Sequence, residues 1–227
     1  MSDAGGVVGA DGEDGEGGEQ IGEPAQLVFA LCHEIGNLLA AVRLQAHMLD
    51  EGLGRKQIAI ASIEIDDLAY RSAALLRHLR PLLAPLAGTP VREDPAAVAA
   101  GLEREIAEQG GRGVRIEVQV VAGLARVAIE REVIHHLIAS LLHVACEAAS
   151  PRGRVVLRVE PREGEVAFVV EDDGASADDP SGWSRQALRG RALLCAVADH
   201  ILRKRGGRLV AGRSEGLSRV ELLLPIA

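Results

Sequence analysis

The sequence is poor in aromatic residues and has no excess of basic ones. Aromatic side chains make up 2% of the 227 residues, with two Phe, one Tyr and one Trp. Lys and Arg number 25 against 33 Asp and Glu, which gives a formal net charge of -8. Nucleic-acid surfaces need clustered cations, and single-strand binding also needs rings for base stacking. The composition therefore argues against nucleic acid as a partner, and the charge argues against an anionic membrane surface.

Cysteine and long apolar runs are also scarce. The three cysteines, Cys32, Cys146 and Cys195, show no CxxC spacing, which is typical of reduced thiols in a reducing compartment. No uncharged apolar run approaches the ~20 residues that span a bilayer. The first residues lack the positive charge and the apolar run of a signal peptide. We therefore expect a soluble, cytoplasmic protein that does not associate with membranes.

The acidic charge is concentrated at the N-terminus. Residues 1–20 hold six acidic residues, no Lys or Arg, and seven glycines. Such a segment buries too little apolar surface to offset its ordering entropy, so we expect residues 1–21 to be disordered. The rest of the chain carries a formal charge of only -2, so its function does not rest on bulk charge.

Two long helices are predicted over residues 24–50 and 55–83. Along the second, apolar or small residues recur at alternating steps of three and four, which is the repeat of bundle packing: Ile58, Ala61, Ile65, Leu68, Ser72, Leu75, Leu79 and Leu82. The short Gly-rich connection makes the helices antiparallel neighbours. Two helices alone would leave apolar surface wet, so we expect two chains to form a four-helix bundle. We assign this hairpin to residues 22–88.

After residue 95 the pattern becomes mixed, and residues 95–227 are predicted to form an α+β unit. The expected helices are 96–109, 129–149 and 188–205, and the expected strands are 114–121, 154–160, 165–171, 208–213 and 218–224. The fold class of the chain is therefore α+β, with a helical hairpin preceding a mixed layer of helices and strands.

His33 lies off the apolar stripe of the first helix, on a face turned toward solvent. Glu34 follows it directly, and Asn37 lies one turn later on the same face as His33. By itself, a histidine on a helix surface is most simply read as solvated. However, a neutral imidazole is a good nucleophile near neutral pH, and an adjacent carboxylate can hold one ring nitrogen protonated. The other nitrogen is then free to accept a phosphoryl group.

Residues 31–42 (LCHEIGNLLAAV) resemble the H-box of bacterial sensor histidine kinases. In that family a His-Glu/Asp-x-x-Asn/Thr turn sits on the first of two dimerising helices. A Pro that is common after the Asn is Leu38 here. The resemblance implies that His33 is the phosphoacceptor and that Glu34 orients the imidazole. It also implies that Asn37 positions a water molecule or a receiver domain.

The element order after residue 95 resembles the ATP-binding domain of histidine kinases and the related Bergerat (GHKL) proteins, which implies an α/β sandwich. The nucleotide motifs are degenerate. The Mg²⁺-coordinating Asn of the N-box falls on Val144, whose side chain has no oxygen to offer a hard cation. In the Asp-x-Gly-x-Gly motif, the adenine-reading Asp172 and the first glycine, Gly174, remain, whereas the last glycine is lost.

The second glycine box is more strongly altered. The family's Gly-Thr-Gly-Leu-Gly-Leu falls on residues 190–195 (GRALLC), where Gly190 is the one glycine left of three. These glycines let the backbone approach phosphates at a helix start, and side chains there obstruct the approach. Loss of the metal ligand and the phosphate loop together predicts a degenerate ATPase-like domain that binds no ATP.

An intact phosphoacceptor turn beside a degenerate nucleotide site resembles the histidine phosphotransferases that descend from histidine kinases, of the ChpT type. The resemblance implies a homodimeric phosphorelay shuttle in bacterial two-component signalling. His33 would carry a phosphoryl group between response-regulator receiver domains, supplied by an upstream hybrid histidine kinase. No cofactor is expected, because the receiver domain supplies the Mg²⁺.

Two alternatives remain open. One is a non-catalytic dimeric binding partner, or a phosphatase acting through Asn37, for a response regulator. The other is a divergent ATP-dependent histidine kinase. No metal site is predicted, because the remaining histidines and cysteines form no closed ligand set in the sequence: His135, His136, His143 with Cys146, and Cys195 with His200.

Overall fold

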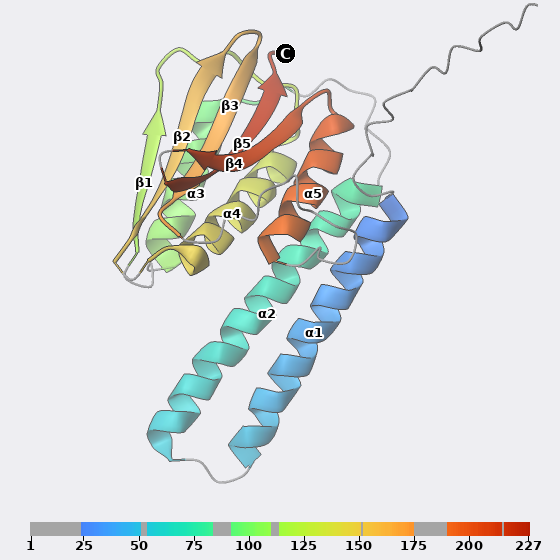
Figure 1. Ribbon diagram of the computed structural model, residues 1–227, viewed down its shortest axis with the longest axis vertical. Coiled ribbons are helices and arrows are strands. Elements are labelled where there is room, and N and C mark those ends of the chain that lie inside the picture. The colour runs from blue at the N-terminus through green and yellow to red at the C-terminus, as the bar shows by residue number, and fades with distance from the viewer. Residues whose placement is uncertain are drawn as a thin grey trace, which may run out of the picture.

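The structure is a computed structural model that describes residues 24–50, 54–83, 92–109, 114–150, 152–174, 190–214 and 216–227. The expected disordered tail lies outside these residues. Figure 1 shows a long hairpin that projects from a layered body of helices and strands. The α+β class is thereby confirmed, whereas the domain ranges 22–88 and 95–227 stay predictions.

The hairpin consists of α1 (Pro24–Asp50) and α2 (Arg55–Leu83), as the apolar spacing predicts. In α1 the buried side chains follow steps of four and three: Leu27, Leu31, Ile35 and Leu38. All four belong to the main core that the hairpin shares with the body. Toward the hairpin tip the same helices expose large apolar side chains, among them Leu44, Ile58 and Ile63. Of the predicted stripe on α2, a single chain buries four residues, half-buries three and leaves Ile58 exposed.

Among the described residues, α1 is the one helix long and apolar enough to cross a membrane, over Pro24–Leu49. Glu34 and Arg43 interrupt this stretch, so it is not an uncharged apolar run. In the structure one face of α1 packs against α2 and α5. The cytoplasmic location stays a prediction.

In the described residues, the body contains three helices and a five-stranded sheet. The elements are α3 (Pro95–Gln109), β1 (Arg115–Val120), α4 (Arg131–Ala148), β2 (Arg154–Arg162), β3 (Glu165–Asp172), α5 (Gly190–Arg203), β4 (Arg208–Ser214) and β5 (Leu217–Pro225). The strand order is β1-β2-β3-β5-β4, with β1 parallel to β2 and the other pairs antiparallel. The three helices cover one face of the sheet (Figure 1). Each described element lies within three residues of its predicted bounds.

β3 is the central strand of the sheet and is buried along most of its length. Its side chains alternate between the two faces. Phe168, which is fully buried, points into the main core under the helices, whereas Ala167 and Val169 pack with Leu223 on the opposite face. Phe168 is the largest fully buried side chain, and its neighbours are mostly Leu, Ile, Val and Ala. The low aromatic content is therefore compatible with a full core.

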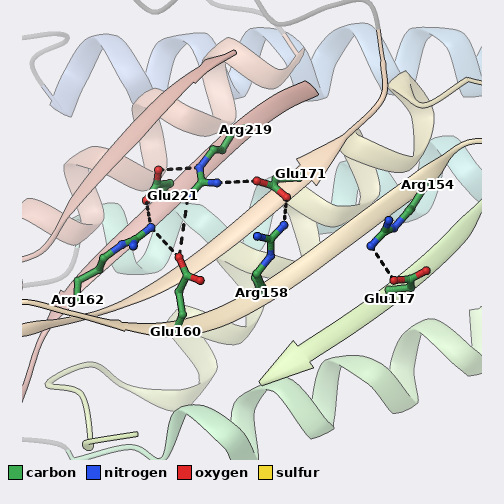
Figure 2. Close-up of polar contacts among 8 residues, drawn as sticks. All are labelled: Glu117, Arg154, Arg158, Glu160, Arg162, Glu171, Arg219 and Glu221. Carbon is green, nitrogen blue, oxygen red and sulfur yellow. Dashed lines mark hydrogen bonds and ion pairs between the residues drawn. The ribbon is translucent and has the colours of Figure 1, made fainter. Parts of the chain in front are cut away.

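The face of the sheet away from the helices carries a lattice of ion pairs (Figure 2). Glu171 on β3 is buried, and it accepts hydrogen bonds from Arg158 on β2 and, at 2.6 Å, from Arg219 on β5. The hydrogen bond to Glu221 and the nearby carboxylates raise the pKa of Arg219 above its usual value. The remaining pairs drawn include Arg162 with Glu160 and Glu221, and Arg154 with Glu117. Acidic and basic groups balance, so this open face stays polar without a second helical layer.

α2 is joined to the body through a buried histidine. His78 is 1% exposed, and its Nε2 lies 2.9 Å from the Ser140 hydroxyl oxygen on α4. Burial, followed by the positive charges of His136 and Arg77, lowers the pKa of His78 from 6.5 to about 4. The side chain is therefore neutral in the folded protein at neutral pH.

This burial predicts loss of stability in mild acid. Between pH 6.5 and about 4 the unfolded chain binds a proton at His78 that the folded chain does not, so stability falls as the pH drops. The effect is on the order of 3 kcal/mol, because each pKa unit corresponds to about 1.4 kcal/mol. Urea unfolding at pH 7 and pH 4.5 measures it. His78→Gln should flatten the pH dependence, whereas His47→Gln, at an exposed position on α1, should not. Equal slopes for wild type and His78→Gln would contradict the prediction.

Candidate functional site

His33 is exposed on α1, the helix that packs against α2 and α5. Leu31 and Ile35, on either side in sequence, are buried in the core. Because these two side chains fix the rotation of α1, the imidazole must face outward. This places it where the sequence predicts, within reach of a partner protein.

Glu34 and Asn37 lie in different surroundings. Asn37 is exposed one turn after His33, on the same side of α1. Glu34 is half-buried and lines a pocket between the hairpin and the body. Among the described residues, no hydrogen bond or ion pair joins Glu34 to His33. The orienting contact that the resemblance implies would therefore require Glu34 to turn its carboxylate toward the imidazole.

Residues at the positions of the nucleotide motifs line the pocket beside Glu34. It has a volume of about 220 Å³ and is formed by all five helices. Ser140, His143 and Val144 of the N-box helix line one side, and Gly190 and Leu194 at the start of α5 line another. The sequence motifs are thus brought together in space, with α2 closing the pocket. Val144 contributes only hydrocarbon at the position of the metal-binding Asn.

Asp172, the residue that resembles the adenine reader, is already bound within the chain. It ends β3 and is 2% exposed. Its Oδ1 accepts a hydrogen bond from the backbone N–H of Gly174 at 3.0 Å, and its Oδ2 lies 2.5 Å from Nη2 of Arg191. Arg191 also donates to the hydroxyl of Ser218 on β5. The guanidinium of Arg191 therefore pairs with the Asp172 carboxylate. By the resemblance, a nucleotide-binding relative would offer this carboxylate to adenine.

The glycine next to this carboxylate, Gly174, is required by sterics. A Cβ added at Gly174 would lie 2.4 Å from the carbonyl oxygen of Ala148 and 2.7 Å from Oδ1 of Asp172. Any larger residue would push the turn away from the carboxylate. Gly174 therefore remains necessary for packing, whether or not a nucleotide binds.

The first turn of α5 is packed as core. Gly190 starts the helix with φ +51°, and the side chains of Ala192, Leu194 and Cys195 are all buried. Burial raises the pKa of the Cys195 thiol to about 12, which leaves it protonated and unreactive. Side chains thus fill the first turn of α5, where the resemblance places the glycines that let phosphates approach.

Arg191 is the residue that sequence reasoning missed. It stands at the position of the Thr in the family's second glycine box, and nothing in the spacing indicates that it pairs with Asp172. One signal was available in the sequence. Arg191 replaces the small Thr of the family's second glycine box, while the acidic Asp172 of the other motif is kept. Only the fold shows that the start of α5 lies against the end of β3.

Comparisons with known proteins agree with this architecture. No family model matches the chain. The C4-dicarboxylate transport sensor protein DctB of Pseudomonas aeruginosa is 30% identical over 219 residues, covering 86% of this chain and 35% of the relative. The histidine kinase ThkA, solved in complex with the response regulator protein TrrA, is similar with a TM-score of 0.64 at 15% identity, over 89% of this chain and 61% of that one. The chain has the histidine-kinase fold.

A second structure supports the same conclusion. The Acinetobacter baumannii histidine kinase AdeS is similar with a TM-score of 0.61 at 14% identity, over 86% of this chain and 98% of that chain. The resemblance drawn from the H-box and the mixed segment is thereby confirmed at the level of the histidine-kinase fold. The chain spans about a third of the length of the curated relative that it matches.

The Asp172–Arg191 pair predicts a large effect on stability. Arg191→Met leaves a buried carboxylate without its cation, so the free energy of unfolding should fall by about 3 kcal/mol or more. The double variant Asp172→Asn/Arg191→Met should recover part of that loss, because it removes the unpaired charge. Urea unfolding measures both.

Arg154→Met is the matched control. Arg154 pairs with Glu117 at 2.8 Å, but its side chain is 53% exposed, so its loss should cost less than about 1 kcal/mol. If Arg191→Met proved no more destabilising than Arg154→Met, the buried pair would not hold the site closed.

Proposed function

We propose that this protein is a phosphorelay histidine phosphotransferase of the ChpT type. His33 shuttles a phosphoryl group between receiver-domain aspartates of two-component signalling proteins, without ATP and in the cytoplasm. One observation carries the proposal: the chain exposes His33 in an H-box turn while Arg191 holds the carboxylate of Asp172. A phosphoacceptor is present, and the nucleotide site is filled from within.

The transfer needs only a positioned imidazole. One ring nitrogen of His33 attacks the phosphorus of an aspartyl phosphate on the receiver. The N–P bond forms, the P–O bond breaks, and the aspartate leaves as a carboxylate with the electron pair. A second receiver's aspartate reverses the step. The receiver supplies Mg²⁺, so this chain contributes orientation through Glu34 and Asn37, and the barrier falls mainly through positioning.

Independence from ATP is supported by three features of the nucleotide region. Val144 offers no metal ligand in the pocket. The α5 start is packed with side chains where phosphates would approach. The Asp172 carboxylate is engaged by Arg191. Losing all three contacts removes the metal, the phosphate cradle and the base reader together.

The partners follow from the fold and from the exposed hairpin. ThkA, which has the same fold, is solved in complex with a response regulator, and this supports a receiver domain as the partner of His33. The apolar side chains near the hairpin tip support a homodimer that buries them in a four-helix bundle. An upstream hybrid histidine kinase would supply the phosphoryl group to the first receiver.

We expect acid-labile label to move from a phosphorylated receiver domain onto wild-type chain and not onto His33→Gln. His47→Gln is the matched control, because His47 is also exposed on α1 but has no acidic residue after it. Gel electrophoresis with a radiolabelled receiver provides the measurement. Label retained in His33→Gln would refute the phosphoacceptor assignment. A wild-type chain that binds a phosphorylated receiver without gaining label would instead identify a non-catalytic partner, or a phosphatase if phosphate is released.

A divergent ATP-dependent histidine kinase is the second candidate. The observation in its favour is the histidine-kinase fold itself, and ShkA, similar with a TM-score of 0.56, is solved in complex with AMPPNP. Calorimetric titration with Mg-ATP separates the two functions. We expect no heat of binding, because the Asp172 carboxylate and the phosphate approach are both occupied. Micromolar affinity followed by autophosphorylation of His33 would establish the kinase instead.

A further inference from the structure

Three side chains with metal-binding atoms meet where the hairpin contacts the body. Asp67 comes from α2, and His143 and Glu147 come from α4. One ligand atom from each lies within 4.8 Å of the others. His143 and Glu147 are one helical turn apart, which places them on one face, and Nε2 of His143 lies 3.8 Å from Oε1 of Glu147.

We propose that Asp67, His143 and Glu147 bind a divalent ion of the zinc class. One imidazole nitrogen and two carboxylate oxygens are a donor set that Zn²⁺ accepts, with water as the fourth ligand. Mg²⁺ prefers oxygen ligands alone in octahedral geometry, so it fits this set poorly. The site is separate from phosphotransfer at His33 and uses none of its proposed residues.

The geometry requires only small movements. Tetrahedral bonds of about 2.0 to 2.2 Å place zinc ligands roughly 3.4 Å apart. The present separations are somewhat larger, and Glu147 is exposed with a long side chain that can close the gap. The ring of Tyr70 lies against His143, with the ring centroids 5.4 Å apart, and limits the rotation of the imidazole.

Arg71 competes with a metal ion for the carboxylate of Glu147. Its Nη1 lies 3.2 Å from Oε1 of Glu147, so a metal must share or displace that ion pair. Bound metal would join α2 to α4 directly and would fix the hairpin against the body. A bound metal ion would therefore influence the orientation of the helix pair that carries His33.

Titration of the full chain with Zn²⁺ against a chromophoric chelator tests the site, with the melting temperature as a second readout. We expect one Zn²⁺ per chain and a melting temperature that rises with its concentration. His143→Gln and Asp67→Asn should each weaken binding by at least the roughly 10-fold to 100-fold that loss of an outer-shell partner costs. Arg71→Gln should tighten binding, because it removes the competing cation.

His135→Gln is the matched control. His135 lies on the same helix and lines the same pocket, but it pairs with Glu105 at 3.3 Å and is outside the cluster. This variant should bind Zn²⁺ as wild type does. Glu147→Gln keeps the size of a partly exposed side chain and removes its charge, so it tests the site even if the other variants fold poorly.

Three results would overturn the proposal. They are no Zn²⁺ binding by wild type, equal binding by wild type and Glu147→Gln, and a loss in His135→Gln as large as in His143→Gln. Mg²⁺ binding as tight as Zn²⁺ would also contradict the donor set. All four outcomes are read from metal binding, so they are independent of whether His33 carries a phosphoryl group.

Discussion

The buried carboxylate of Asp172 is the constraint on which the rest of this account depends. A carboxylate that is 2% exposed needs a charged or hydrogen-bonding partner inside the fold. Arg191 is that partner, together with the backbone N–H of Gly174. To reach Asp172, Arg191 must lie in the first turn of α5, and the following apolar side chains then enter the core. One ion pair thus joins the start of α5 to the end of β3, and we propose that it closes the nucleotide region.

In this proposal the body serves as a scaffold for the hairpin. Its sheet buries one face under three helices and covers the other with paired Arg and Glu side chains (Figure 2). Its helices α4 and α5 hold the hairpin, partly through the buried contact between His78 and Ser140. Under the proposed function the chemistry belongs to His33, whose outward position on α1 follows from the burial of Leu31 and Ile35.

Much of this architecture was predictable, because it depends on local periodicity. The apolar stripes set α1 and α2 to within a residue, and the position of His33 off its stripe predicted its exposure. The sequence also showed the replacement of the metal-binding Asn by Val144 and of two motif glycines by Ala192 and Leu194. The rest depends on contacts between distant segments: Arg191 with Asp172, Asp67 with His143 and Glu147, and Glu34 turned into a pocket rather than paired with His33. No spacing rule encodes those contacts, because side-chain neighbours are set by tertiary packing.

The central claim is that His33 receives its phosphoryl group from another protein and not from ATP. Intact-mass measurement at neutral pH tests it most directly, on full chain incubated separately with Mg-ATP and with a phosphorylated receiver domain. The account predicts the added mass of one phosphoryl group, localised to His33, in the receiver sample alone. The same addition in the Mg-ATP sample would contradict it, because the chain would then bind and use the nucleotide that Arg191 is proposed to exclude.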